Sequence, residues 1–194
     1  IFYLVLNVVL TVFLMFAGMN LFDAICHAFG TMATGGFSTY DTSVGHFDSA
    51  TIDYIITLFM IAAGTNFALF YTLVVLDKSG KDFWVWIKDK FTSIFSDIEF
   101  RVYLGIIVFS TIVIMASGMV AGDWGLTSAA TTEDSIGATL LRSLRFGLFQ
   151  VVAIVTTTGF GTNDFDSWSQ FGRCLMFALM FIGGCAGSTG GGMK

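Results

Sequence analysis

The chain contains no proline and few charged residues, and each shortage narrows what it can be. Among its 194 residues, 55% are hydrophobic and only 12% are charged, which is about half the charged share of a typical soluble domain. Its mean hydropathy of +0.81 and its 22 phenylalanines indicate lipid as the surrounding solvent. Because proline is absent, any break in a helix has to come from glycine.

Basic residues and cysteines are scarce as well. The nine Lys and Arg residues form no patch of the kind that binds nucleic acid, so no nucleic-acid partner is expected. The cysteines Cys26, Cys174 and Cys185 are spaced like neither a disulfide framework nor a zinc site, and we interpret them as small buried residues. No charged n-region or cleavage site accompanies the apolar N-terminal run, so it is not a signal peptide. We expect the chain to be a fragment of a longer protein.

Long uncharged runs organise the chain. Four of them have about 20 residues, which is the length of a membrane-spanning helix: 1–22, 54–76, 102–122 and 174–193. Two shorter runs, 24–40 and 146–163, begin apolar and end in Thr and Gly, which a helix does not easily continue through. We expect these two runs to hold half-helices over about 22–33 and 138–155.

The placement of charge predicts a topology. The segment 78–101 holds five of the nine basic residues, whereas the acidic loops 41–53 and 123–134 hold none. The positive-inside rule then places 78–101 in the cytoplasm and both acidic loops outside. Aromatic residues among its charges favour an interfacial helix for 78–101 over a plain cytoplasmic hairpin. Re-entrant loops at 24–40 and 146–163 fit this topology, although charge alone leaves open a full crossing by 24–40.

One unit of sequence occurs twice. Residues 34–41 align without gaps on residues 157–164, with five of eight positions identical, and Phe-Asp-Ser follows both copies. Each copy reads as span, half-helix, T-x-G-F loop, acidic loop and span. We therefore predict an all-α integral membrane protein with repeated pore units and partly broken second spans. The units are 1–77 and 102–194, and 78–101 joins them.

The T-x-G-F loops have the chemistry of a cation pathway. A permeant cation exchanges its water for oxygen ligands, and backbone carbonyls supply them where the backbone is extended and irregular, as glycine permits. A preceding half-helix presents the negative end of its dipole, and the acidic loops concentrate cations at the outer mouth. A simple membrane turn is the alternative, which the repetition disfavours. The candidate filter spans 34–38 and 157–161, with the ion-binding residues Thr34, Gly35, Gly36, Phe37, Thr157, Thr158, Gly159 and Phe160.

A glycine cluster follows the second filter loop. Six glycines within 183–192 weaken a helix that begins near residue 174, so the helix is expected to break on the cytoplasmic side of the filter. A loop at this depth is a candidate gate, and close helix packing through small residues is the alternative. The candidate gate residues are Gly183, Gly184, Gly187, Ser188, Thr189, Gly190, Gly191 and Gly192.

These motifs carry a family resemblance. The half-helix, T-x-G-F loop and second span are similar to the pore unit of potassium channels. More closely, the segments 32–39, 156–162 and 181–194 resemble the TrkH-type membrane subunit of bacterial Trk potassium uptake systems, over nearly the whole chain. The resemblance implies potassium uptake across the cell inner (cytoplasmic) membrane of a bacterium, with K⁺ held at the filter residues and no organic cofactor in this chain.

The resemblance also implies an assembly. In that family one multi-pass chain carries four pore units around one pore, and this chain would hold the second and third. The partners implied are a second copy in a homodimer, a cytoplasmic ring of TrkA-like nucleotide-binding regulatory subunits, and membrane lipids. The glycine-rich segment would gate the pore.

Rival functions are weaker. An enzyme is rejected because the P-loop-like end at 187–194 has its Lys displaced and no preceding strand, and because Ser188 lacks the flanking glycine pattern of a hydrolase nucleophile. A secondary transporter coupling K⁺ to H⁺ or Na⁺ through broken helices stays the alternative. We interpret His27 as packed or hydrogen-bonded rather than proton-coupling, Arg145 as snorkelling to the interface, and Asp23 as a helix N-cap.

The filter interpretation makes a prediction about Gly159. Gly159→Ser in the full-length protein should lower potassium uptake relative to sodium, because glycine at this place lets the backbone turn its carbonyls toward the ion. Potassium and sodium fluxes into proteoliposomes measure the ratio. A flux ratio equal to that of the unaltered protein would contradict the interpretation.

Overall fold

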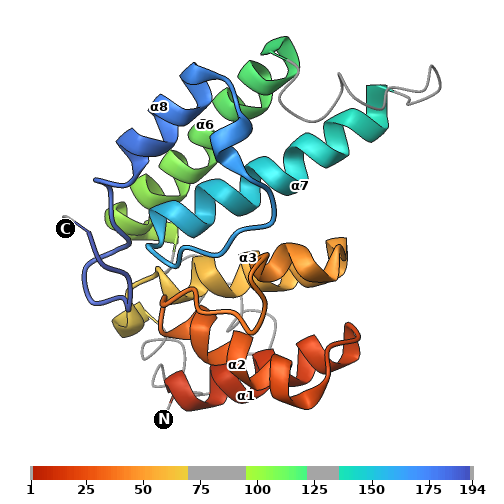
Figure 1. Cartoon of the computed structure of the whole chain (residues 1–194). Coiled ribbons are helices and arrows are strands. Elements are labelled where there is room, and N and C mark those ends of the chain that lie inside the picture. Colours follow the sequence, from red (N-terminus) through yellow and green to blue (C-terminus); the bar gives the residue numbers. More distant parts are fainter. Residues whose placement is uncertain (1, 70–94, 122–135, 193–194) are drawn as a thin grey trace.

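The computed structural model describes residues 2–69, 95–121 and 136–192, and within these ranges the elements are helices joined by loops (Figure 1). The helices are α1 (Phe2–Phe16), α2 (Leu21–Met32), α3 (Ala50–Ala63), α6 (Ile98–Ala121), α7 (Ile136–Val155) and α8 (Gln170–Leu179). Two short 3-10 helices lie in the loops, η1 (Ser43–Phe47) and η2 (Phe165–Ser167). No β-strand occurs in the described part of the chain, which confirms the predicted all-α class.

The helices form two similar groups. In the first, the half-helix α2 packs against α1 and α3, and in the second the half-helix α7 packs against α6 and α8. The two groups meet where α3 lies along α7, so the second span of one unit contacts the half-helix of the next (Figure 1). The half-helices α2 and α7 correspond to the segments predicted around 22–33 and 138–155.

The other helices are shorter than the predicted spans. The run 1–22 is divided by a turn at Gly18, whose φ of +106° ends α1 before α2 begins. The prediction of one continuous helix over 54–76 is wrong, because α3 ends at Ala63 and Gly64 is its C-cap. A methyl group on Gly64 would lie 2.4 Å from the Tyr103 hydroxyl, so glycine allows this close contact. Among the described helices, α6 has the length and mean hydropathy, 24 residues and 2.3, to cross a membrane.

Several predicted features lie outside the described residues. They are most of the interfacial segment 78–101, the acidic loop 123–134, and residues 70–76 and 193 of two predicted spans.

The outer surface of the helices is apolar. Leu10, Leu14, Ile56 and Met60 are buried, whereas α6 directs residues such as Val120 outward. An apolar exterior around a buried apolar core is the pattern of a membrane protein. Of the cysteines, Cys185 is buried and Cys174 is exposed, so the interpretation of all three as buried is wrong.

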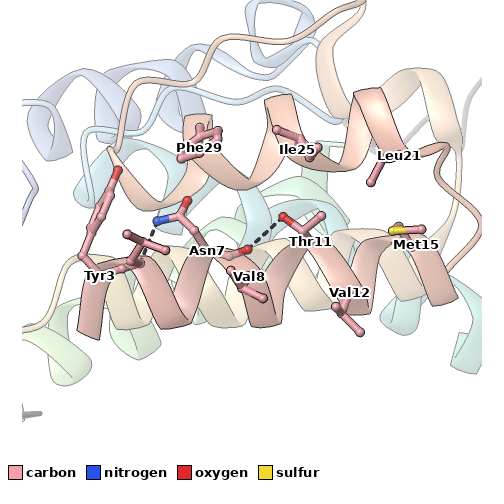
Figure 2. Close-up of a pocket in the computed structure, with 10 residues that line it drawn as sticks. Tyr3, Asn7, Val8, Thr11, Val12, Met15, Leu21, Ile25 and Phe29 are labelled. Carbon is pink, nitrogen blue, oxygen red and sulfur yellow. Dashed lines mark hydrogen bonds between the residues drawn. The ribbon is translucent and has the colours of Figure 1, made fainter. Parts of the chain in front are cut away.

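Between α1 and α2 lies an apolar groove of about 570 Å³ (Figure 2). Two side-chain donors of α1 in its wall bond within their own helix: Asn7 Nδ2 donates to the Tyr3 carbonyl oxygen at 2.8 Å, and the Thr11 hydroxyl donates to the Asn7 carbonyl oxygen at 2.8 Å. Such internal hydrogen bonds let polar side chains occupy a helix that faces hydrocarbon. The Asn7 Oδ1 is buried with no hydrogen-bond partner among the described residues.

The N-terminus of α2 is capped one turn earlier than predicted. Asn20, rather than Asp23, is the N-cap, and its Oδ1 accepts the Asp23 backbone N–H at 2.8 Å. Asn20 Nδ2 also donates to the Asp23 carboxylate at 2.7 Å, a bond between the two side chains. The Asp23 carboxylate is thereby fixed at the positive end of the half-helix.

A buried ion pair joins the two units. Arg145 on α7 places its Nε 2.6 Å from the Asp53 Oδ2 on α3, and the Asp53 side chain is 2% exposed. A second carboxylate, Asp48, lies 3.3 Å from the Arg145 guanidinium but is 87% exposed. The interpretation of Arg145 as snorkelling outward is therefore wrong, because a buried carboxylate on the neighbouring unit draws the guanidinium inward.

The ion pair makes a prediction about stability. Asp53→Asn should lower the free energy of unfolding by about 3–5 kcal/mol, because it leaves the Arg145 charge without its buried partner. Asp48→Asn, the matched control on the exposed carboxylate, should change it by less than about 1 kcal/mol. Unfolding of the full-length protein in detergent measures both. Equal losses from the two variants would contradict the assignment.

Candidate functional site

The two T-x-G-F loops have the same backbone fold. Thr34 and Thr157 have φ of 50° and 57°, and Gly36 and Gly159 have φ of 65° and 82°. The hydrogen bonds also repeat at equivalent positions: Gly36 N–H donates to the Gly30 carbonyl at 3.2 Å and Gly159 N–H to the Ala153 carbonyl at 3.0 Å. The repeat found in the sequence is therefore a repeat in three dimensions.

This backbone suits a carbonyl-lined path. In a regular strand successive carbonyls point to opposite sides. A residue with positive φ at every second position reverses that alternation, so neighbouring carbonyl oxygens can share one side. Such a conformation is uncommon for a β-branched residue such as Thr34 or Thr157, and strained backbone of this kind occurs mainly at functional sites. The C-terminal ends of α2 and α7 precede the loops and add partial negative charge there.

The two loops contact each other directly. A methyl group built on Gly36 would lie 2.0 Å from the Thr158 carbonyl oxygen, so only glycine lets the first loop come this close to the second. Further out, Gly45 N–H donates to the Gly161 carbonyl oxygen at 3.1 Å, and Gly161 N–H donates to the Ser43 hydroxyl at 3.2 Å. The T-x-G-F loop of the second unit and the loop that holds η1 in the first unit are thus held together.

The phenylalanines of the two loops have different surroundings. Phe160 is 2% exposed and packs behind α2, where its ring lies 3.1 Å from a methyl group built on Gly30. Phe37, its equivalent, is 82% exposed. The first half-helix therefore supports the second loop, and the corresponding surface for Phe37 is not supplied by the described residues.

The Asp23 carboxylate holds the residues that follow the first T-x-G-F loop. The Asp23 carboxylate accepts hydrogen bonds from the Thr39 hydroxyl at 2.7 Å and the Tyr40 hydroxyl at 3.0 Å. In the second unit the position equivalent to Asp23 is Phe146, and the equivalent hydroxyl, that of Thr162, is buried with no hydrogen-bond partner among the described residues.

The glycine-rich segment 183–192 lies against both T-x-G-F loops. The Thr34 hydroxyl donates to the Thr189 carbonyl oxygen at 2.9 Å, and the Thr157 hydroxyl accepts the Gly191 N–H at 2.7 Å. The first residue of each filter loop is thus bonded to the segment proposed from sequence as a gate. The structure brings the predicted filter residues and the predicted gate residues into one site.

The same segment closes the broken end of α3. Cys185 N–H donates to the Gly64 carbonyl oxygen at 2.9 Å, and the Thr189 N–H and hydroxyl donate to the Ala63 carbonyl oxygen at 3.3 and 3.1 Å. The carbonyls at a helix end have no partner within the helix, and here the glycine-rich segment supplies one. On the far side, Ala186 N–H donates to the Glu99 carboxylate of α6.

Close packing accounts for glycine in this segment. A methyl group on Gly183 would lie 2.3 Å from the Gly191 carbonyl oxygen, so the segment folds back on itself only without side chains. The break in the helix was predicted from the glycines. The contacts of this segment with Thr34, Thr157 and Glu99 were not predicted, because no local pattern links residues so far apart in the sequence. The one available signal was that Thr34 and Thr157 are equivalent positions of the repeat and both carry a hydroxyl group.

The chain is similar to known cation transport proteins. A family model described as TrkH, cation transport protein, matches residues 1–194. The Trk system potassium uptake protein TrkH of Escherichia coli K12 is 39% identical over 192 residues, covering 99% of this chain and 35% of that protein. The Trk system potassium uptake protein TrkG of the same organism is 31% identical and covers 92% of this chain and 31% of that protein.

A solved structure has the same fold. The crystal structure of the potassium transporter TrkH from Vibrio parahaemolyticus matches with a TM-score of 0.79 at 37% identity, covering 100% of this chain and 36% of that one. The chain therefore spans about a third of the length of these relatives. Their transport function agrees with the rejection of both enzyme interpretations.

The contact between the loops makes a prediction about Gly36. Gly36→Ala should abolish most ion flux through the full-length protein, because a methyl group both strains a φ of +65° and meets the Thr158 carbonyl oxygen. Gly105→Ala is the matched control on α6, where a methyl group meets no described atom within 4 Å. Ion flux per inserted protein in proteoliposomes measures the effect. Flux in Gly36→Ala equal to that in Gly105→Ala would contradict the assigned contact.

Proposed function

Because the chain belongs to the TrkH family of cation transport proteins, we propose that it supplies two adjacent pore units of a potassium uptake pathway. The observation that carries the proposal is the pair of loops with one backbone conformation, in direct contact through Gly36 and Thr158. Two such loops give two walls of a path whose ligands are backbone carbonyls.

The geometry of the loops supports a ring with further units. Gly36 faces the Thr158 carbonyl of the following loop, whereas Gly159, its equivalent, has no described atom within 4 Å of an added methyl group. Phe160 packs behind the preceding half-helix, whereas Phe37, its equivalent, is exposed. Each unit therefore has one surface for the next unit and one for the previous unit. The surface at Gly159 and the surface at Phe37 have no such neighbour among the described residues, and further units on both sides would cover them.

We assign K⁺ as the permeant ion, held at the carbonyls and hydroxyls of the two T-x-G-F loops. The relatives are named as potassium uptake proteins, and the loops of this chain supply uncharged oxygen ligands rather than carboxylates. Ligands of this kind suit a weakly hydrated monovalent cation that has to leave as readily as it enters. The chain would act as a multi-pass protein of the bacterial inner membrane.

We assign gating to the segment 183–192. It lies against the two T-x-G-F loops, where the Thr34 hydroxyl donates to the Thr189 carbonyl oxygen and the Gly191 N–H donates to the Thr157 hydroxyl. Further bonds run from Cys185 and Thr189 to the end of α3 and from Ala186 to Glu99. Opening would replace these bonds, each worth about 0.5–1.5 kcal/mol, with bonds to water. A nucleotide-binding regulatory subunit on the cytoplasmic side is a suitable source of that energy, and a second copy in a homodimer completes the proposed assembly.

The proposed function is tested on the full-length protein in proteoliposomes. Reversal potentials under opposed K⁺ and Na⁺ gradients should follow the potassium gradient, with no coupled movement of H⁺ or Na⁺. A reversal potential set by a fixed ratio of two ions would instead establish the coupled transporter, and absence of potassium flux would contradict both.

The gate is tested at Thr189. Thr189→Val should raise the open probability of single channels about two- to tenfold, because it removes the hydroxyl bond to the Ala63 carbonyl oxygen and so weakens the closed arrangement. Thr111→Val is the matched control, since its hydroxyl makes the same kind of bond to the Ile107 carbonyl oxygen on α6. Equal open probability in the two variants would contradict a gating role for this contact.

A further inference from the structure

The side chain of His27 touches both filter loops. It lies on α2 and is fully buried. Its Nε2 is 2.9 Å from the Ser38 hydroxyl oxygen at the end of the first loop. Its ring stacks on Phe160 of the second loop, with centroids 5.8 Å apart and planes inclined by 24°.

The hydrogen bonds around His27 have one direction. The Asp23 carbonyl oxygen, 2.8 Å from His27 Nδ1, can only accept, so Nδ1 carries the hydrogen. At the other end the Tyr40 backbone N–H donates to the Ser38 hydroxyl oxygen at 3.2 Å, and the same hydroxyl can donate its own hydrogen to Nε2 of a neutral imidazole. A neutral imidazole with its hydrogen on Nδ1 thus links the Asp23 carbonyl oxygen to the Ser38 hydroxyl, and this tautomer is assigned from the hydrogen-bond partners.

The second unit supports its loop differently. Gln150 occupies the position equivalent to His27, and its Nε2 donates to the Asn163 backbone oxygen. Gly161 occupies the position equivalent to Ser38 and has no hydroxyl. The first loop thus has Ser where the second has Gly, and the same unit has His27 where the second has Gln150. The hydrogen bond between Ser38 and His27 explains why the first loop has a hydroxyl at this position.

We infer that His27 is a positioning residue for ion selection, which fixes the first filter loop through Ser38 and the second through Phe160. The inference rests on the proposed function. His27 does not contact the ion. It sets how closely the two walls of the path approach, and a change in that distance alters the fit to K⁺ and to Na⁺ differently. A core residue that only filled space would leave the ion preference unchanged when the Ser38 hydroxyl was removed.

The test compares variants of the full-length protein by K⁺/Na⁺ permeability ratio, from reversal potentials in proteoliposomes. Ser38→Ala removes the hydroxyl at a half-buried site, with its bonds to His27 and to the Tyr40 N–H, and His27→Phe keeps an aromatic ring but loses both of its hydrogen bonds. Each should lower the ratio about two- to tenfold, the effect of losing the Ser38–His27 hydrogen bond that both variants remove. The double variant should be no lower than the lower of the two single variants, because the two side chains act through one contact. Ile25→Val on the same helix, facing the α1 groove, is the control and should keep the ratio.

The outcomes separate the two claims. An unaltered protein that passes no potassium would overturn the proposed function. An unaltered protein that prefers potassium, with Ser38→Ala retaining the same ratio, would overturn the role of His27 and leave the proposed function standing. Multiplied losses in the double variant would likewise show that His27 and Ser38 do not act through their mutual hydrogen bond.

Discussion

Irregular backbone inside a membrane has to find hydrogen-bond partners within the protein, and this constraint organises the molecule. The two T-x-G-F loops, the residues that follow α3 and the segment 183–192 are all non-helical and adjacent. Each uses the polar groups that another leaves open: carbonyls of α3 accept from the glycine-rich segment, and filter threonines bond to the same segment. In hydrocarbon an unpartnered peptide group costs several kcal/mol, so these elements stabilise one another or do not form.

The constraint also explains why glycine is concentrated here. Hydrogen bonds between two irregular backbones require the chains to approach more closely than side chains allow. Gly36 against Thr158 and Gly183 against Gly191 are the tightest such approaches in the filter and the glycine-rich segment. In an aqueous protein so many glycines weaken a helix. Here the absence of side chains lets two backbone segments approach closely enough to hydrogen-bond each other, where water would otherwise be the partner.

Much of this arrangement could be predicted from the sequence, because the relevant signals are local and repeated. The uncharged runs, the T-x-G-F repeat and the glycine cluster predicted an all-α membrane fold with half-helices at the observed places. The early end of α3 was missed, since Gly64 resembles any glycine in a span until Tyr103 and Thr156 are brought beside it. The inward direction of Arg145 was missed for the same reason: its partner Asp53 lies 92 residues away on another unit.

The two filter loops share their backbone hydrogen bonds but not the side chains that support them. His27 and Asp23 hold one loop, whereas Gln150 and Phe146 occupy the equivalent places in the other. In a channel made of identical subunits, one substitution alters every wall of the pore at once. In the proposed pore the walls are successive parts of a single chain, so a substitution in one loop alters one wall and leaves the others as they were. Such a pore can be adjusted one wall at a time.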